Sequence, residues 1–272
     1  MKELVFGTQL LGSQLNTKDS LNMLSHSYEC GINHFDTAER YPFPESSKNF
    51  GLTEKIIGEW LKKNKSIRKK VIISSKVTGR NFGEIKNISS KRLNPKRIIS
   101  SVDKILKRLN TSYIDNYFLH WPDRFTNNFG REYYDPDKDS IYIKIENQYS
   151  ALQKLKQQGK ILNFGISNET PWGVMKFVSI NNRFFKPILQ EEYSILNRDI
   201  ERSIKEISIR EKLKIYSYSP LSGGLLTGKY FDKINKSRQL RGIIYKKKSK
   251  KILNKKFFDD LKKLKIFFLK KK

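Results

Sequence analysis

The chain has 272 residues, 37% of them hydrophobic, which suits one large domain or two small ones. Cys30 is the only cysteine, so an internal disulfide framework is excluded and a reducing compartment is expected. The opening residues MKELVFGTQLLG lack the apolar core of a signal peptide, and no apolar run approaches the roughly 20 residues that cross a bilayer. We therefore expect a soluble, cytoplasmic protein with no membrane span.

The formal net charge is +28, and 41 of the 55 basic residues are lysines. Such a balance can indicate a nucleic-acid partner or an anionic membrane surface. The lysines are spread over the faces of expected helices, however, and they accompany many Ile and Asn residues. We interpret them as a solvated surface and expect no specific nucleic-acid partner.

The one dense basic block is residues 246–272, with 13 lysines against two aspartates. Its pattern fits a core-facing helix with a basic back, or a helix on a membrane surface, and we favour the first. We therefore divide the chain into a main domain, residues 1–245, and a lysine-rich helical tail, residues 246–272. The apolar residues at helical spacing in the tail are Ile252, Phe257, Leu261, Leu264 and Phe268.

Short β-rich segments alternate with amphipathic segments from the start of the chain. Gly31 ends the first helix, and Ile56, Ile57, Trp60 and Leu61 make the second apolar on one side. In chain order, the first elements are a strand over 3–8, a helix over 18–30, a strand over 33–37, a helix over 53–63 and a strand over 71–76.

The next helix carries the clearest signals in the sequence. Asn94 is a typical N-cap, and Pro95 suits the first turn. The helix ends near Leu109, and one stripe along it is apolar. The members of that stripe are Ile98, Val102, Ile105, Leu106 and Leu109.

The same alternation continues through the second half of the chain. Gly159 stops one helix, and Thr170 followed by Pro171 starts the next. The expected elements are a strand over 113–120, a helix over 150–158, a strand over 163–168, a helix from 170, a strand over 187–193, a helix over 199–212 and a strand over 213–220.

Seven βα repeats of this kind predict a parallel sheet covered by helices. A doubly wound sheet and a (β/α)₈ barrel both have this pattern. A barrel brings all its carboxyl strand ends to one mouth, and no G-x-G-x-x-G motif follows the first strand, so we favour the barrel. The polar residues at or near those strand ends are Asp36, Lys76, His120, Ser167, Asn168 and Gln190.

A barrel mouth would bring Asp36, Tyr41, Lys76 and His120 together, and their chemistry is complementary. An unperturbed tyrosine titrates near pH 10, and a neighbouring lysine favours its phenolate. An aspartate would pair with the lysine, and a histidine can orient a carbonyl oxygen by a hydrogen bond. Such a group can protonate an oxygen while hydride reaches the adjacent carbon.

Five segments, in order and spacing, resemble the aldo-keto reductase superfamily over roughly residues 3 to 245. The resemblance implies NADPH as cofactor, reversible reduction of an aldehyde or ketone to an alcohol, and a small-molecule carbonyl substrate. It also implies that Tyr41 is the general acid, Lys76 and Asp36 its tuning pair, and His120 the residue that orients the substrate. The five segments are GINHFDTAERYP (31–42), SSK (74–76), YFLHWPDRFTNNFG (117–130), GKILNFGISNETPWGVM (159–175) and YSYSPLSGGLLTGKY (216–230).

The resemblance further implies a set of cofactor-binding residues. Ser167, Asn168 and Gln190 would hold the nicotinamide carboxamide, and Tyr218 would lie against the nicotinamide ring. The remaining cofactor-binding predictions are Thr8, Ser219, Leu221, Gly223, Gly224, Lys229 and Arg238, the last for the adenosine phosphate.

Each of these residues also has a structural interpretation when taken alone. Asp36 fits a helix cap or turn, Tyr41 fits packing beside Pro42, and His120 fits a hydrogen-bonded core histidine. Lys76 and Lys229 fit surface lysines. Only the complete set, in the order that a barrel requires, favours catalysis.

No eighth strand is evident after Tyr230, so we expect an incomplete barrel with two unpaired strand edges. A helix over 250–268 could cover the gap. Three functions therefore stay open: an NADPH-dependent carbonyl reductase, a non-catalytic relative with weak or no cofactor binding, and a basic binder of nucleic acid or membrane surfaces.

Overall fold

The structure is a computed structural model that describes residues 3–79, 92–127, 133–139, 142–180, 185–228 and 255–269. The chain divides into two compact units, which we describe separately. The first unit comprises Met1–Gln190 and Glu206–Tyr216, and the second comprises Glu191–Lys205 and Ser217–Lys272.

Seven strands form one sheet in the order of the sequence, as a (β/α)₈ barrel requires. Each of the first five pairs in parallel with the next strand. The strands are β1 (Val5–Gly7), β2 (His34–Asp36), β3 (Ile72–Val77), β4 (Ile114–Leu119), β5 (Ile161–Ser167), β6 (Ile188–Glu192) and β7 (Ile215–Tyr218).

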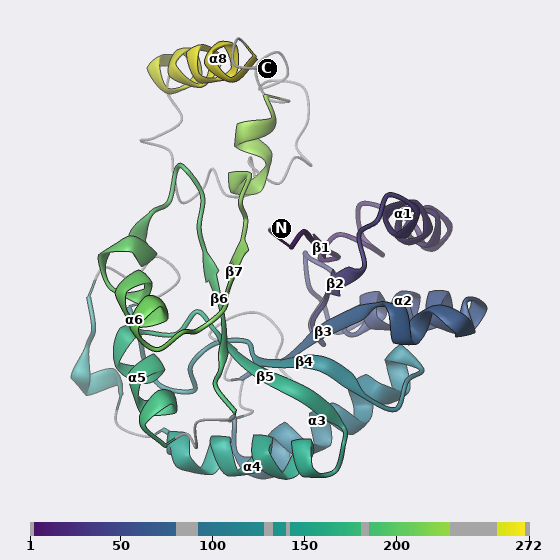
Figure 1. Cartoon of the computed structure of the whole chain (residues 1–272), viewed down its shortest axis with the longest axis vertical. Helices are drawn as coiled ribbons and strands as arrows, with labels where there is room; N and C mark the ends of the chain where they lie inside the picture. Colours follow the sequence, from purple (N-terminus) through teal and green to yellow (C-terminus); the bar gives the residue numbers. More distant parts are fainter. Residues whose placement is uncertain are drawn as a thin grey trace. The chain divides into compact units, whose positions relative to one another are not determined.

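The helices follow the strands in alternation, and α1 to α5 lie on the outer side of strands β1 to β5 (Figure 1). Consecutive helices from α1 to α5 pack against one another. The α-helices are α1 (Thr17–Glu29), α2 (Leu52–Lys63), α3 (Pro95–Leu109), α4 (Ile145–Gln157), α5 (Pro171–Ile180), α6 (Ile204–Arg210) and α8 (Lys255–Leu269). The 3₁₀ helices are η1 (Lys65–Lys70), η2 (Pro136–Lys138), η3 (Asp199–Arg202) and η4 (Ser222–Thr227).

The signals at the start of α3 act as predicted. The Asn94 side chain accepts a hydrogen bond from the Arg97 backbone N–H, and Pro95 is in the first turn. Of the predicted apolar stripe, Ile98, Val102, Ile105 and Leu109 are buried.

The core lies between the sheet and its helices. Strand β3 is buried from Ile73 to Val77, as is typical of a parallel strand covered on both faces. Because polar residues are included in that run, the burial forces them to find hydrogen-bond partners on neighbouring strands or helices.

The predicted barrel with a missing eighth strand is confirmed for the described part of the chain. There β1 and β7 are the edges of the sheet, and no eighth strand occurs. Residues near the starts of these two edge strands are linked by an ion pair, with the Glu3 carboxylate 2.5 Å from Lys214 Nζ. Glu3 also lies 2.6 Å from Nδ1 of the buried His34 on β2.

Two predicted helices were wrong in their bounds. Helix α4 begins at Ile145 rather than at residue 150, because the buried residues Ile145 and Tyr149 extend its apolar face by one turn. Its N-cap is Lys144, which makes no side-chain capping bond, so no start signal marked it. The helix expected over 199–212 is interrupted at Ser203, whose backbone is not helical.

In the second unit, helix α8 occupies part of the predicted tail. Leu261 on this helix is buried, whereas Ile266 and Phe267 are about half exposed. The domain boundary after residue 245 lies outside the described residues and stays a prediction, as does the covering of the open sheet edge by this helix.

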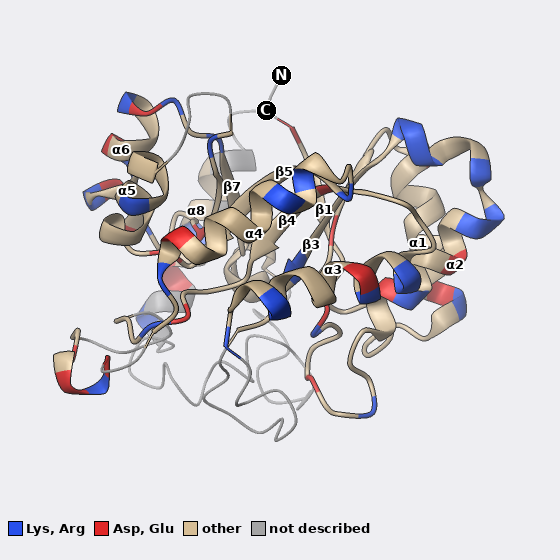
Figure 2. Ribbon diagram, turned by 90° about the horizontal axis from the view of Figure 1, so that it is seen from below, with Lys and Arg blue, Asp and Glu red and all other residues tan. Residues whose placement is uncertain are grey.

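The charges are spread over the surface. Helices α2, α3 and α4 each carry both basic and acidic side chains (Figure 2). Among the described residues, no helix is long and apolar enough to cross a membrane, and no cluster of His, Cys, Asp and Glu is arranged to hold a metal ion.

Candidate active site

A buried ion pair joins the first two strand ends of the site. Asp36 is the last residue of β2, and Lys76 lies near the end of β3. Lys76 Nζ is 2.6 Å from Asp36 Oδ2 and donates a second hydrogen bond to the Thr37 carbonyl at 2.7 Å. The Lys76 side chain is 1% exposed, so its charge is compensated by the Asp36 carboxylate rather than by water.

Tyr41 and His120 lie beside this pair. Tyr41 is in the loop after β2, and Lys76 Nζ is 5.3 Å from the centre of its ring. The Tyr41 and His120 rings meet edge to face with centroids 5.9 Å apart. The structure therefore brings the four predicted catalytic residues together at one end of the sheet.

The surroundings of His120 favour its neutral form. Burial, together with the positive charges of Lys76 and Arg40, lowers the pKa of His120 well below its usual value. Its Nδ1 is buried and has no hydrogen-bond partner among the described residues. A neutral imidazole carries no positive charge, and it can donate a hydrogen bond from only one of its two nitrogens.

The nicotinamide residues predicted from the sequence are adjacent and linked to this group. Ser167 Oγ donates to the Gln190 carbonyl at 2.8 Å, and Asn168 Nδ2 donates to the His120 carbonyl at 3.0 Å. Gln190 Nε2 donates to Asp36 Oδ1 at 2.9 Å. Thr8, also buried, donates through its hydroxyl to the Asp36 carbonyl at 2.8 Å.

The predicted phosphate loop belongs to the second unit. Tyr218 ends β7, and its carbonyl accepts a hydrogen bond from the Tyr193 N–H at 3.3 Å. The backbone is left-handed at Ser219, Gly223 and Gly224, and the two glycines adopt this conformation without strain. Leu221 is exposed. The predicted residues Lys229 and Arg238 lie outside the described residues.

The sequence reasoning missed two side chains beside the catalytic group. Arg40 stacks over the Trp121 ring at 4.8 Å from its centre and forms an ion pair with Glu45. Trp121 in turn contacts the His120 ring, with centroids 4.8 Å apart. Each directly adjoins a predicted catalytic residue in the sequence, and that adjacency was the available signal.

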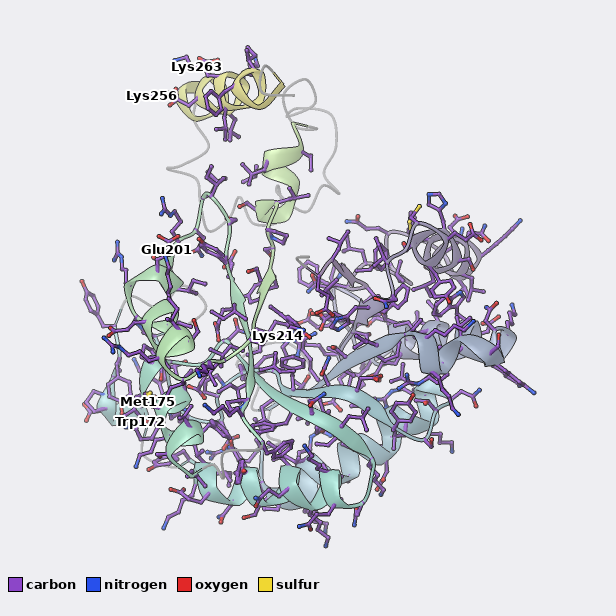
Figure 3. The ribbon with its side chains drawn as sticks, viewed as in Figure 1. Trp172, Met175, Glu201, Lys214, Lys256 and Lys263 are labelled. Carbon is purple, nitrogen blue, oxygen red and sulfur yellow. The ribbon has the colours of Figure 1, made fainter. Side chains whose placement is uncertain are left out.

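A second aromatic and cationic contact follows β4 and β5. Arg124 forms a buried ion pair with Glu169 and stacks over Trp172, 4.7 Å from the ring centre. Trp172 and Met175 project from α5 and are 50% and 42% exposed (Figure 3). A Cβ at Gly173 would lie 2.2 Å from Glu169 Oε1, so any other residue there would displace the Glu169–Arg124 pair.

Two buried carboxylates support the strands that carry the site. Glu39 accepts hydrogen bonds from the Thr78 N–H and from Ser101 Oγ. Glu54 accepts from Ser75 Oγ at 2.5 Å and from Arg108 Nε at 2.6 Å. Ser75 immediately precedes Lys76, so this contact anchors β3 from the side opposite the ion pair.

The comparisons with known proteins agree with this geometry. The model of the aldo/keto reductase family matches residues 3–265. The chain belongs to the aldo/keto reductase family. It is 38% identical to the Tas protein of Escherichia coli over 230 residues, which are 83% of this chain and 66% of that protein.

Two further relatives are less similar to the chain in sequence. The chain is 30% identical to the NADH-specific methylglyoxal reductase of Escherichia coli over 221 residues, which are 79% of this chain and 60% of that protein. Its structure resembles that of the aldo-keto reductase AKR11C1 from Bacillus halodurans in the holo form. That match has a TM-score of 0.64 at 28% identity and covers 82% of this chain and 64% of the other. The chain thus spans slightly less than two thirds of the length of these relatives.

Proposed function

We propose that the chain is an NADPH-dependent oxidoreductase that reduces an aldehyde or ketone to an alcohol. The observation that carries the proposal is the buried Asp36–Lys76 ion pair beside Tyr41 and His120. Membership in the aldo/keto reductase family supports the same reaction class.

In this proposal Tyr41 donates a proton to the carbonyl oxygen. The Lys76 ammonium stabilises the phenolate that remains, and Asp36 compensates the ammonium charge while holding its position. Neutral His120 donates a hydrogen bond from Nε2 to the same oxygen. Its Nδ1 is buried and has no hydrogen-bond partner among the described residues, so we assign the imidazole proton to Nε2. The Trp121 and Tyr41 rings both contact the His120 ring and limit the access of water to it.

The residues present fit a nicotinamide cofactor, which when bound would supply hydride to the carbonyl carbon. Gln190 uses one amide hydrogen on Asp36, and its Oε1 accepts no hydrogen bond from the described residues. The amide therefore has an acceptor and a second N–H with which to hold a carboxamide, alongside Ser167 and Asn168. In the second unit, the left-handed turn at Gly223 and Gly224 suits close approach of backbone N–H groups to phosphate.

We extend the proposal to NADPH rather than NADH and to a cytoplasmic location. The single free cysteine, Cys30, supports a reducing compartment. One relative is named as NADH-specific, so the choice of cofactor requires a direct comparison.

The test is a titration of the purified chain with NADPH and, separately, NADH, followed by tryptophan fluorescence. Saturable binding and reduction of a carbonyl such as methylglyoxal would support the proposal. Tyr41→Phe is expected to bind the cofactor like the parent chain and to lose at least about a hundredfold in kcat, the range of general acid catalysis. A folded chain that binds neither cofactor would refute it and favour a non-catalytic relative.

A further inference from the structure

The side chain of Gln190 bonds to the catalytic ion pair itself. Its Nε2 donates to Asp36 Oδ1 at 2.9 Å, across 154 residues of sequence. Lys76 Nζ occupies the other oxygen of the same carboxylate, Oδ2, at 2.6 Å. Both oxygens of Asp36 therefore have a donor, and the two donors come from different strands, β6 and β3.

The backbone of Gln190 is fixed as firmly as its side chain. Gln190 pairs with Ser167 in the parallel register of β5 and β6. Its carbonyl accepts from Ser167 Oγ at 2.8 Å and from the Asn168 N–H at 3.2 Å. Because the residue is only 5% exposed, water cannot readily replace its amide as the donor to Asp36.

We propose that Gln190 is a positioning residue that orients the Asp36 carboxylate toward Lys76 and thereby ties the proton-donating group to the residues at the carboxyl end of β5. The effect of Gln190 on catalysis rests on the proposed function. Its contact with Asp36 does not require a bound cofactor.

The physical reason lies in the geometry of a carboxylate. With Oδ1 held by Gln190, only Oδ2 faces the Lys76 ammonium, and the direction of their bond is set. Without that donor the carboxylate can rotate, and Oδ1 becomes a partly buried acceptor with one partner fewer. The Lys76 ammonium then loses its fixed partner, and its position relative to Tyr41 is no longer defined.

The first experiment measures this without requiring activity. The cofactor-free chain is treated with formaldehyde and a borane reductant, and the rate of methylation of each lysine is followed by peptide mass spectrometry. Gln190→Met removes the amide while keeping a similar length. We expect Lys76 to react about tenfold faster, the change that loss of one hydrogen bond to a charged group produces.

Lys186 is an internal control for the local fold. It lies just before β6, and its Nζ donates to the Glu211 carbonyl at 2.6 Å, so loosening of β6 would increase its reactivity. Ser167→Ala is the matched variant, because Ser167 contacts the Gln190 backbone and not Asp36. The proposal expects Lys186 to be unchanged in Gln190→Met, and Lys76 to be unchanged in Ser167→Ala.

An unchanged Lys76 rate in Gln190→Met, or parallel increases at Lys76 and Lys186, would overturn the proposal. Gln190→Leu repeats the measurement with different packing if the first variant does not fold. In the active enzyme, Gln190→Met is expected to lower kcat at saturating cofactor and to move its pH profile, whereas Ser167→Ala mainly weakens cofactor binding. A parent chain without turnover would refute the proposed function and leave the labelling result to decide the role of Gln190.

Discussion

The Asp36–Lys76 ion pair should be strongly coupled in folding as well as in catalysis. At 2.6 Å and an effective dielectric constant near 20, the attraction between the two charges is about 6 kcal/mol before desolvation. Burial of the ammonium cancels part of this gain, because the Lys76 side chain is only 1% exposed. Removing one partner leaves the other charge buried, which typically costs about 3–5 kcal/mol.

We therefore expect Lys76→Met to lower the free energy of unfolding by about 3 kcal/mol, at the lower end of the range because Gln190 still donates to Asp36. Asp36→Asn should cost a similar amount. The double variant should lose less than the sum, since neither charge is left alone, and we expect a coupling energy of about 2–3 kcal/mol.

The assay is urea unfolding at pH 7, followed by tryptophan fluorescence, for the parent chain, both single variants and the double variant. The exposed pair Lys63–Glu59 is a matched control, with a similar separation of 2.7 Å and side chains 61% and 44% exposed. Its coupling should be no more than about 0.5 kcal/mol. Additive losses within about 0.5 kcal/mol for Asp36 and Lys76 would refute the reasoning.

Further predictions concern the packing of α2 and the dependence of stability on pH. A Cβ on Gly58 would lie 2.1 Å from the Arg108 carbonyl oxygen, so Gly58→Ala should destabilise the fold by about 2 kcal/mol despite the better helix propensity of alanine. Gly7→Ala, where nothing lies within 4 Å of the new Cβ, should change the unfolding free energy by less than about 0.5 kcal/mol, and equal effects in thermal unfolding would contradict this. Burial lowers the pKa of His34, so below about pH 6.5 the unfolded chain takes up a proton that the folded chain does not. Stability should consequently fall as the pH drops from 7 to 5, and His34→Gln should reduce that slope in denaturant titrations; an identical slope would show that His34 does not contribute.

The sequence predicted correctly those features that neighbouring residues encode, such as helix starts and the alternation of strands and helices. Asn94 and Pro95 mark the start of α3, and the alternation of strands and helices predicts a parallel sheet. Parallel strands place their carboxyl ends together, so Asp36 and Lys76 could be predicted to meet although 40 residues separate them. Their catalytic roles stay predictions.

Other features have no local signal. Helix α4 starts without a capping side chain, and only the burial of Ile145 shows that the helix extends so far. The stacking of Arg40 on Trp121 depends on the loops after β2 and β4 meeting at the same place. A residue type alone does not predict such contacts, because an exposed arginine and a stacked one look the same in a sequence.

The sequence by itself determined the family, the order of the strands, and the presence of an acid, a lysine and a histidine at or near strand ends with a tyrosine in the loop after one of them. Only the tertiary structure decided which atoms meet. The donation from the Gln190 amide to Asp36, which joins β6 to β2, has no signal in the sequence, whereas the cofactor-binding role of Gln190 stays a prediction. Residue types and their periodicity set what can be buried, whereas the choice among buried hydrogen-bond partners depends on distances of a few tenths of an ångström that arise only when all strands are assembled.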